Sequence, residues 1–204
     1  MANVNFMMVT VAACDPSFVQ QALEHVGGMA AELRDKAGAV STRYGVLSTG
    51  SRAGSLILFQ TYEKLDGIDK AFKVYAESSD YQALMTSGKL SVSMRNIVKM
   101  EAIQLAHPEP QASTYGVVTR WRSANSMVET LKELVPVFEQ NGAVVMRYGT
   151  LMTGEHAGKR LLGMGYRSMD SIEKTYDALL KNKAYTSALS EIELDLRNIV
   201  RFAG

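Results

Sequence analysis

Apolar and polar positions follow the two-residue period of strands and the longer period of helices in one order along the first half of the chain. A β-rich run over 6–11 precedes apolar residues at helical spacing over 18–37, and a glycine-containing turn at 49–54 joins two further strands. A second helix begins near Asp66, and a final strand covers about 90–103. This order, βαββαβ, predicts a ferredoxin-like unit.

The second half of the chain repeats the first. Residues 38–85 return as 142–189 at a constant offset of 104 positions, and Arg95–Val98 returns as Arg197–Val200 at an offset of 102. The offset changes between the expected elements, as a duplication predicts. We therefore expect an α+β protein of two tandem ferredoxin-like repeats: one over 1–104, a proline-containing linker over 105–114, and one over 115–204.

Composition excludes several classes of protein. The 22 basic and 21 acidic residues leave a net charge of +1 without a basic stripe, so we expect no nucleic-acid partner. The single cysteine, Cys14, cannot form an intramolecular disulfide or a multi-cysteine metal site. The apolar run 6–14 is only nine residues long, lacks a preceding cationic segment and ends at Asp15-Pro16, so we expect neither a membrane span nor a signal peptide. We expect a cytoplasmic protein with no membrane partner.

One face of the second predicted strand is retained in both repeats, whereas the opposite face changes. The retained face carries Arg43, Gly45, Leu47 and Thr49, and it returns as Arg147, Gly149, Leu151 and Thr153. One interpretation is that this face packs the contact between repeats or the helices, with each arginine paired to a carboxylate. The other is that Arg43 and Arg147 line a cavity and bind an anionic or carbonyl group through their planar donor forks.

Aromatic side chains are the other candidate ligand contacts. They are Tyr44 and Tyr148 on the opposite strand face, and Tyr62, Trp121 and Tyr166 at strand ends. Such amphipathic side chains suit a cavity mouth, although aromatic residues at strand ends also serve as lids of a core. Both interpretations remain open from the sequence.

The final strand of each repeat contains an arginine followed by an asparagine, Arg95-Asn96 and Arg197-Asn198. Strand alternation sends the two side chains to opposite faces. We expect one of each pair to face solvent or the strand edge, with a role in a site as the alternative.

His25 is the candidate catalytic residue, because it lies on the flank of the first helix's apolar stripe and its counterpart is Thr130. It is either a general base or haem ligand pointing into a barrel, or a partly buried histidine bonded to a neighbour. The adjacent Gly27-Gly28 indicates a close backbone approach or a helix break. No metal-ligand set, phosphate loop or dinucleotide fingerprint is present in the sequence, so we expect no metal and no cofactor.

The chain resembles the dimeric α+β barrel superfamily, which includes antibiotic-biosynthesis-type monooxygenases, muconolactone-isomerase-like enzymes, stress-responsive barrel proteins and plant polyketide cyclases. The resemblance rests on the element order and on Ser78-Ser79-Asp80-Tyr81 and Asn182-Lys183-Ala184-Tyr185, which are similar to a "small-Pro-x-Tyr" stretch, although both copies lack the proline. It implies that the two sheets pack face to face as an intramolecular barrel. It also leaves room for a homo-oligomer.

Three functions remain compatible with the sequence. The first is a small-molecule-binding barrel for an apolar or weakly acidic ligand. The second is a cofactor-independent enzyme of the monooxygenase, isomerase or cyclase kind, in which His25 or a tyrosine hydroxyl moves a proton. The third is a structural assembly module with a fully packed interior. A duplicated chain is free to keep chemistry in one repeat, so an enzyme should have one asymmetric pocket.

Overall fold

A computed structural model describes residues 3–204. The elements of the first repeat are β1 (Phe6–Cys14), η1 (Pro16–Phe18), α1 (Val19–Ala37), β2 (Ser41–Leu47), β3 (Leu56–Tyr62), α2 (Leu65–Glu77), α3 (Ser79–Thr86) and β4 (Leu90–Met100). A segment containing η2 (Pro110–Ala112) leads to the second repeat. Its elements are β5 (Tyr115–Ser123), α4 (Val128–Gln140), β6 (Ala143–Leu151), β7 (Arg160–Tyr166), α5 (Met169–Leu180), α6 (Lys183–Ser190) and β8 (Ile192–Phe202).

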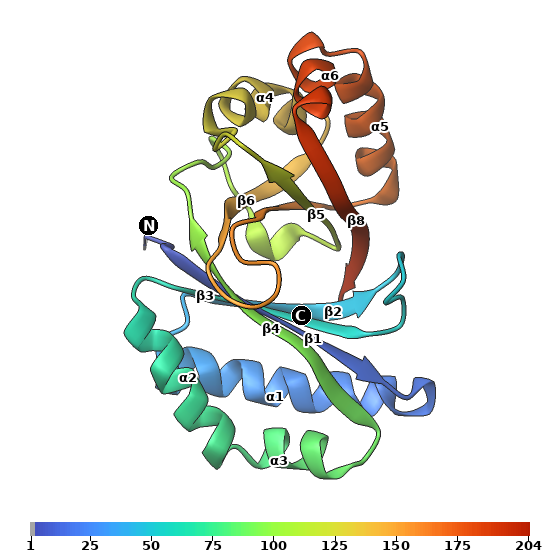
Figure 1. Cartoon of the computed structure of the whole chain (residues 1–204). Coiled ribbons are helices and arrows are strands. Elements are labelled where there is room, and N and C mark those ends of the chain that lie inside the picture. Colours follow the sequence, from blue (N-terminus) through green and yellow to red (C-terminus); the bar gives the residue numbers. More distant parts are fainter. Residues whose placement is uncertain (1–2) are drawn as a thin grey trace.

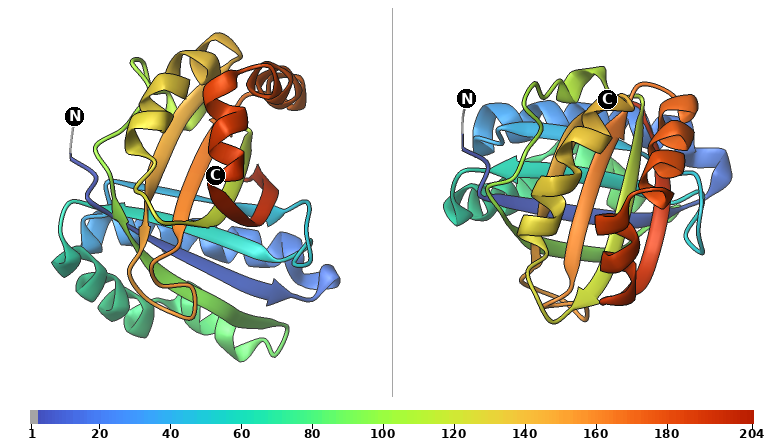
Figure 2. Two further views of the ribbon diagram at one scale, coloured as in Figure 1. Left: turned by 45° about the horizontal axis from the view of Figure 1, so that its top comes forward. Right: turned by 90° about the horizontal axis from the view of Figure 1, so that it is seen from above.

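The strands form a closed barrel in the order β1-β3-β2-β8-β5-β7-β6-β4. Each repeat supplies a four-stranded antiparallel sheet, and the two sheets join at two seams, β2 with β8 and β4 with β6. The helices of each repeat cover the outer face of their own sheet, so two helical layers enclose the barrel (Figures 1 and 2). The expected tandem ferredoxin-like repeats and their intramolecular barrel are confirmed.

The second helix of each repeat is split in two, which the sequence pattern did not predict. In the first repeat the break falls at Ser78, whose hydroxyl accepts a hydrogen bond from the Tyr81 backbone N–H at 3.3 Å. In the second repeat, Asn182 caps α6 in the same way, and its side-chain oxygen accepts a hydrogen bond from the Tyr185 backbone N–H at 3.2 Å. Such N-caps satisfy a backbone donor that the new helix leaves free. The short stretch that resembles the superfamily is therefore a helix break, and it positions a tyrosine in each repeat.

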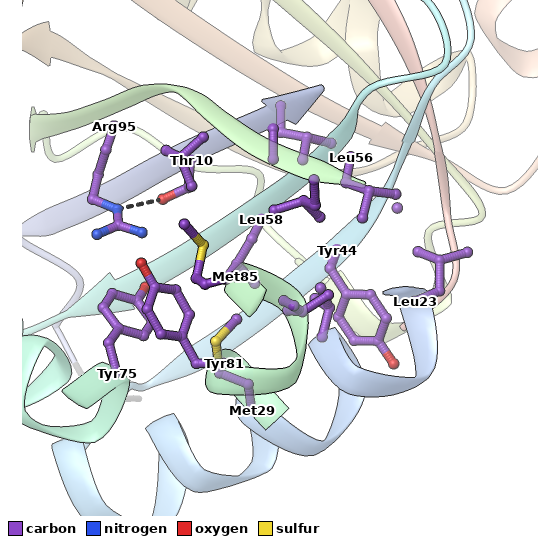
Figure 3. A pocket seen from close by; sticks show the side chains of 17 residues that line it. Thr10, Leu23, Met29, Tyr44, Leu56, Leu58, Tyr75, Tyr81, Met85 and Arg95 are labelled. Atoms are coloured by element: carbon purple, nitrogen blue, oxygen red, sulfur yellow. Dashed lines mark hydrogen bonds between the residues drawn. The ribbon is translucent and has the colours of Figure 1, made fainter. Parts of the chain in front are cut away.

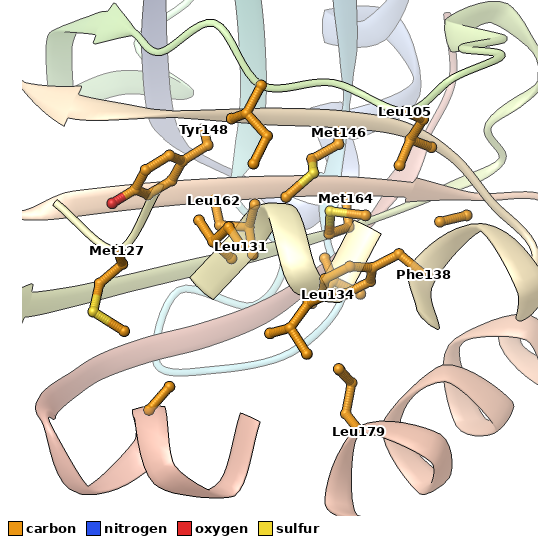
Figure 4. Packing of buried hydrophobic residues seen from close by; sticks show 14 of the residues in the cluster. Leu105, Met127, Leu131, Leu134, Phe138, Met146, Tyr148, Leu162, Met164 and Leu179 are labelled. Carbon is orange, nitrogen blue, oxygen red and sulfur yellow. The ribbon is translucent and has the colours of Figure 1, made fainter. Parts of the chain in front are cut away.

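Strands such as β1, β3 and β7 have buried residues on both faces, and the apolar residues divide between the helix side and the barrel lumen. One cluster in each repeat lies between sheet and helices, as Met8 and Leu58 do in the first repeat and the labelled side chains of Figure 4 do in the second. A third cluster, including Val9 and Ile57, fills the middle of the barrel lumen. Burial of each such side chain stabilises the fold by roughly 1.5 to 3 kcal/mol.

The two repeats clasp each other through the hairpins that follow β2 and β6. The Thr49 hydroxyl accepts a hydrogen bond from the Ile199 backbone N–H at 2.8 Å, and Thr153 accepts one from Ile97 at 2.9 Å. Beside Thr153, Gly154 lies against the Asn96 side chain of the first repeat. Part of the retained face therefore serves the contact between repeats, as one of the two interpretations proposed.

No helix within residues 3–204 has both the length and the apolar character needed to cross a membrane.

Candidate functional site

A small apolar cavity lies between the outer face of the first sheet and its helices, and we call it the first helix-side cavity. Its volume is about 40 Å³. Strands supply Thr10, Leu58 and Arg95 to its wall, while helices supply Tyr81 and Met85 (Figure 3). A concave apolar space with a few polar groups is the usual form of a small-molecule site.

Arg95 is the charged group of this cavity. Its Nε donates to the Thr10 hydroxyl at 3.3 Å, and its guanidinium lies over the Tyr75 ring, 4.6 Å from the centroid. The Tyr75 and Tyr81 rings are stacked with their centroids 4.8 Å apart. Within residues 3–204, no carboxylate forms an ion pair with Arg95. The terminal nitrogens of its fork are therefore available to an acceptor in the cavity.

A buried chain of hydrogen bonds leads to this site. The Tyr62 hydroxyl donates to Gln60 Oε1 at 2.8 Å, and Gln60 Nε2 donates to the Tyr75 hydroxyl oxygen. Burial raises the pKa of Tyr75, so its hydroxyl stays protonated at neutral pH. Because its oxygen accepts from Gln60, the Tyr75 O–H is left to donate to another group.

The second repeat has an equivalent helix-side cavity of about 50 Å³. Arg197 donates to the Thr119 hydroxyl at 3.4 Å and lies 4.7 Å from the centroid of Tyr176. Its Nη2 also donates to the Tyr185 hydroxyl at 3.0 Å, an interaction that Arg95 lacks. The arginine fork is therefore partly occupied in the second repeat.

The buried chain of the first repeat has no equivalent in the second. Met164 stands at the position of Gln60, and Leu179 at the position of Tyr75. The Tyr166 hydroxyl, equivalent to that of Tyr62, is buried and has no hydrogen-bond partner in the part of the chain described. The two cavities share an arginine, a threonine and a tyrosine, and they differ in the groups that support them.

Arg43 and Arg147, the sequence candidates for an anion site, face the barrel lumen, where both line one cavity. The expectation that each pairs with a carboxylate is wrong for residues 3–204, since neither takes part in an ion pair there. Arg43 donates to the Ser113 carbonyl and to Gln111 Oε1 instead. The sheets thus separate these arginines, which are in the lumen, from the aromatic candidates on the other strand face.

The five aromatic candidates lie on the helix side of the sheets. Tyr44 lines the first helix-side cavity and Trp121 the second. Trp121 stacks on Tyr148, with centroids 5.6 Å apart. Tyr62 and Tyr166 are 1% and 0% exposed, so they are parts of the core and not of a cavity mouth. The structure therefore does not gather the predicted set of seven ligand contacts into one site.

His25 lines neither helix-side cavity, nor the cavity beside Arg43 and Arg147. Its Nδ1 lies 2.9 Å from Asp80 Oδ1, which joins α1 to α3 at the surface. Gly28 faces the same carboxylate, and a Cβ there would overlap it, so the Gly27-Gly28 pair marks a close approach in a continuous helix. This placement matches the histidine bonded to a neighbour and not the general base pointing into the barrel.

Sequence reasoning missed Gln60 and Tyr75 and undervalued Arg95. The repeated Arg-Asn pair could have indicated Arg95, because an arginine retained in both repeats is expected to make the same contact in each. Arg95 faces the cavity instead of solvent or a strand edge, while Asn96 faces the lumen. Gln60 and Tyr75 are not repeated and gave no signal.

The closed barrel has the dimeric α+β barrel fold, with both halves supplied by one chain. The chain matches the model of a domain of unknown function, DUF6854, over residues 4–100 and 114–202, and it belongs to that family. No curated protein matches the chain.

Solved structures share the fold at low sequence identity. A candidate monooxygenase from Fusobacterium nucleatum subsp. nucleatum is 14% identical with a TM-score of 0.68, covering 100% of this chain and 94% of its own. An anthrone oxidase-like protein is 13% identical with a TM-score of 0.61, covering 99% and 92%. A variant of chlorite dismutase from Candidatus Nitrospira defluvii is 8% identical with a TM-score of 0.65, covering 98% and 91%. These similarities establish the fold alone.

Proposed function

We propose that the protein binds a small, flat aromatic molecule, apolar or weakly acidic, in the first helix-side cavity. The observation that carries this proposal is the free fork of Arg95 inside an apolar cavity. The equivalent fork of Arg197 is engaged by Tyr185, so the first repeat is the one left open to a ligand.

The chemistry of the walls supports a ring that carries one oxygen. Stacked Tyr75 and Tyr81 offer aromatic faces, and a phenol or carbonyl oxygen would accept from the Arg95 fork and the Tyr75 hydroxyl. Met85, 40% exposed, forms part of the wall. Because the cavity is smaller than an aromatic ring system, this flexible side chain would move aside as the ligand enters.

Binding of 2-naphthol, followed by its own fluorescence, tests the proposal. Arg95→Gln should weaken binding by about tenfold, since it removes a charge-assisted hydrogen bond. The duplicated chain supplies its own control, because Arg197→Gln should leave the affinity unchanged. Equal affinity of the wild type and Arg95→Gln, or a loss limited to Arg197→Gln, would rule out this site.

A second candidate function is a cofactor-independent oxidation of the bound molecule. It is favoured by the buried Tyr62–Gln60–Tyr75 hydrogen bonds, because they orient the Tyr75 hydroxyl at the first helix-side cavity and have no equivalent at the second. Two of the structural relatives have names that refer to oxidation, an anthrone oxidase-like protein and a candidate monooxygenase. Anthrone fits the proposed ligand class, and its oxidation by one O₂ gives anthraquinone and one water.

Oxygen uptake with anthrone, together with the absorbance of anthraquinone, tests this second candidate. Tyr75→Phe should keep the ring and lower the rate by about a hundredfold, the lower end of what a positioned proton donor contributes. Leu179→Ala alters the equivalent position of the other repeat and should leave the rate unchanged. Binding of 2-naphthol without oxygen uptake above the protein-free rate would leave binding as the function.

A further inference from the structure

Duplication brings Arg43 and Arg147 to the same end of the barrel lumen. Their strands, β2 and β6, both begin at the end where the segment with η2 lies, and both lead into hairpins at the other end. The two arginines line a cavity of about 80 Å³, which we call the lumen cavity. It shares Ser41, Pro110 and Arg147 with an outer recess of about 680 Å³, so the two spaces are neighbours and Arg147 borders both.

Neither guanidinium group has a carboxylate partner within residues 3–204, and the acceptors that they do have are neutral. Arg147 donates to the carbonyl of its neighbour Met146 at 3.0 Å. Arg43 donates from its two terminal nitrogens to Gln111 Oε1 and the Ser113 carbonyl. Its guanidinium lies 4.6 Å from the centroid of Phe202, and its Nε is buried without an acceptor in residues 3–204. Burial lowers the pKa of both arginines, because it disfavours their charged form. Two positive charges thus face one cavity without a negative charge to offset them.

The other residues that line the lumen cavity indicate which chemical groups an occupant needs besides an anion. Apart from the arginines, the described lining is uncharged and largely apolar, with Met7, Phe59 and Leu161 among its members. A carboxylate, Glu101, lines the outer recess, and it forms no ion pair with either arginine. An occupant therefore needs an anionic group for the arginines and an apolar body for the walls.

Gly163, which lines the lumen cavity, is an independent observation that favours a ligand there. It stands at the position equivalent to Phe59, so the second repeat has no side chain where the first has a large ring. A Cβ at Gly163 would meet only the Arg147 carbonyl, at 3.9 Å, so protein packing does not require glycine there. Glycine inside a strand weakens it, and one cause is a ligand that approaches the backbone closely.

We propose that the lumen cavity is a second binding site, and that it takes a small monocarboxylate with an apolar body between Arg43 and Arg147. The carboxylate accepts from the two guanidinium groups, and the body fills the space beside Gly163. The site is separate from the helix-side cavity, so it goes beyond the function proposed above.

Isothermal titration calorimetry with hexanoate and with its neutral analogue hexanamide tests the assignment. Hexanoate should bind at least about tenfold more tightly than hexanamide, and Arg147→Gln should remove that difference. Gly163→Val should block hexanoate without touching either charge and should retain the wild-type fold. Arg122→Gln changes an exposed arginine outside the lumen and should leave binding unchanged.

Several results would overturn the site. They are equal affinity for hexanoate and hexanamide, no hexanoate binding by the wild type, undiminished binding by Gly163→Val, or inorganic phosphate binding as tightly as hexanoate. Gly163→Val decides the outcome even if Arg147→Gln fails to fold. Arg95→Gln should weaken 2-naphthol and spare hexanoate, and Arg147→Gln should do the reverse, so failure of one site is distinguishable from failure of the other.

Discussion

Gly45 of β2 lies directly opposite Phe202 of β8, and the backbone carbonyl of Arg201 occupies the space that a Cβ at position 45 would need. The other seam repeats this arrangement, where Gly149 lies opposite Met100 and the Lys99 carbonyl takes the space. A backbone group cannot move aside as a flexible side chain can. The two retained glycines therefore let the sheets approach closely enough to close the barrel.

We predict that Gly45→Ala and Gly149→Ala each lower the free energy of unfolding by about 2 kcal/mol, the usual cost of forcing an extra group into a packed site. Gly163→Ala is the matched control, because its Cβ would meet only one atom at an ordinary contact distance. Urea unfolding measures all three variants. Seam variants as stable as the control would show that the sheets can separate to accept a methyl group.

A second prediction concerns the hairpin that clasps the opposite repeat. Gly154 and Gly158 both have left-handed backbones, with φ of 80° and 85°, so alanine costs about 1 kcal/mol of strain at each. A Cβ at Gly154 would also overlap the Asn96 side chain, whereas one at Gly158 would meet nothing within 4 Å. Gly154→Ala should therefore cost about 1 kcal/mol more. Equal losses on urea unfolding would mean that the Asn96 contact contributes nothing.

The repeat could be read from the sequence because identities persist where both copies make the same contacts. Gly45, Thr49 and their counterparts are retained since they form the seams and clasps, and the retained face predicted such a contact. The two-residue period of the strands, however, could not predict which face of a strand lies toward the helices and which lies toward the lumen. In β3 nearly every residue from Leu56 to Tyr62 is buried, so both faces are apolar and alternation carries no information about which is which.

The candidate site was harder to predict because its parts meet through tertiary packing. Arg95 becomes a cavity residue only because α2 and α3 fold over β4 and place Tyr75 and Tyr81 beside it. The break at Ser78 that allows this is a capping effect, and helical spacing alone does not indicate it. The predicted tyrosines lie between sheet and helices, as the helix-side cavities do, but most of them are buried in the hydrophobic core.

A third prediction concerns acid stability. Hydrogen bonds from Lys159 and Arg120, at 2.7 and 2.6 Å, lower the pKa of Asp195 to about 2. Because this pKa lies below the unfolded value of about 3.9, the stabilisation is fully present above pH 4 and is lost as the pH falls toward 2. Asp195→Asn should flatten that part of the profile of unfolding free energy against pH. An unchanged slope between pH 4 and 2 would remove Asp195 as its cause.

The last prediction uses the second repeat as a guide to the buried hydrogen-bond chain of the first. Gln60→Met alone leaves the Tyr62 and Tyr75 hydroxyls without their partner and should cost about 2 to 4 kcal/mol. Tyr75→Leu alone leaves the Gln60 amide unpaired. Together the two changes reproduce the pairing of Met164 with Leu179, which the same fold accommodates.

The double variant should therefore be less destabilised than the sum of the single variants, by about 1 kcal/mol or more, because the Gln60 amide and the Tyr75 hydroxyl are removed together. The Tyr62 hydroxyl stays unpaired, as that of Tyr166 in the second repeat is within residues 3–204. Urea unfolding of the wild type, both single variants and the double variant gives this coupling energy. Gln60→Met combined with Asp195→Asn in the other repeat is the control, and its effects should add to within about 0.5 kcal/mol. Additive effects of Gln60→Met and Tyr75→Leu would show that the Tyr62–Gln60–Tyr75 hydrogen bonds are not energetically coupled. They would also weaken the case that these bonds orient the Tyr75 hydroxyl for proton transfer.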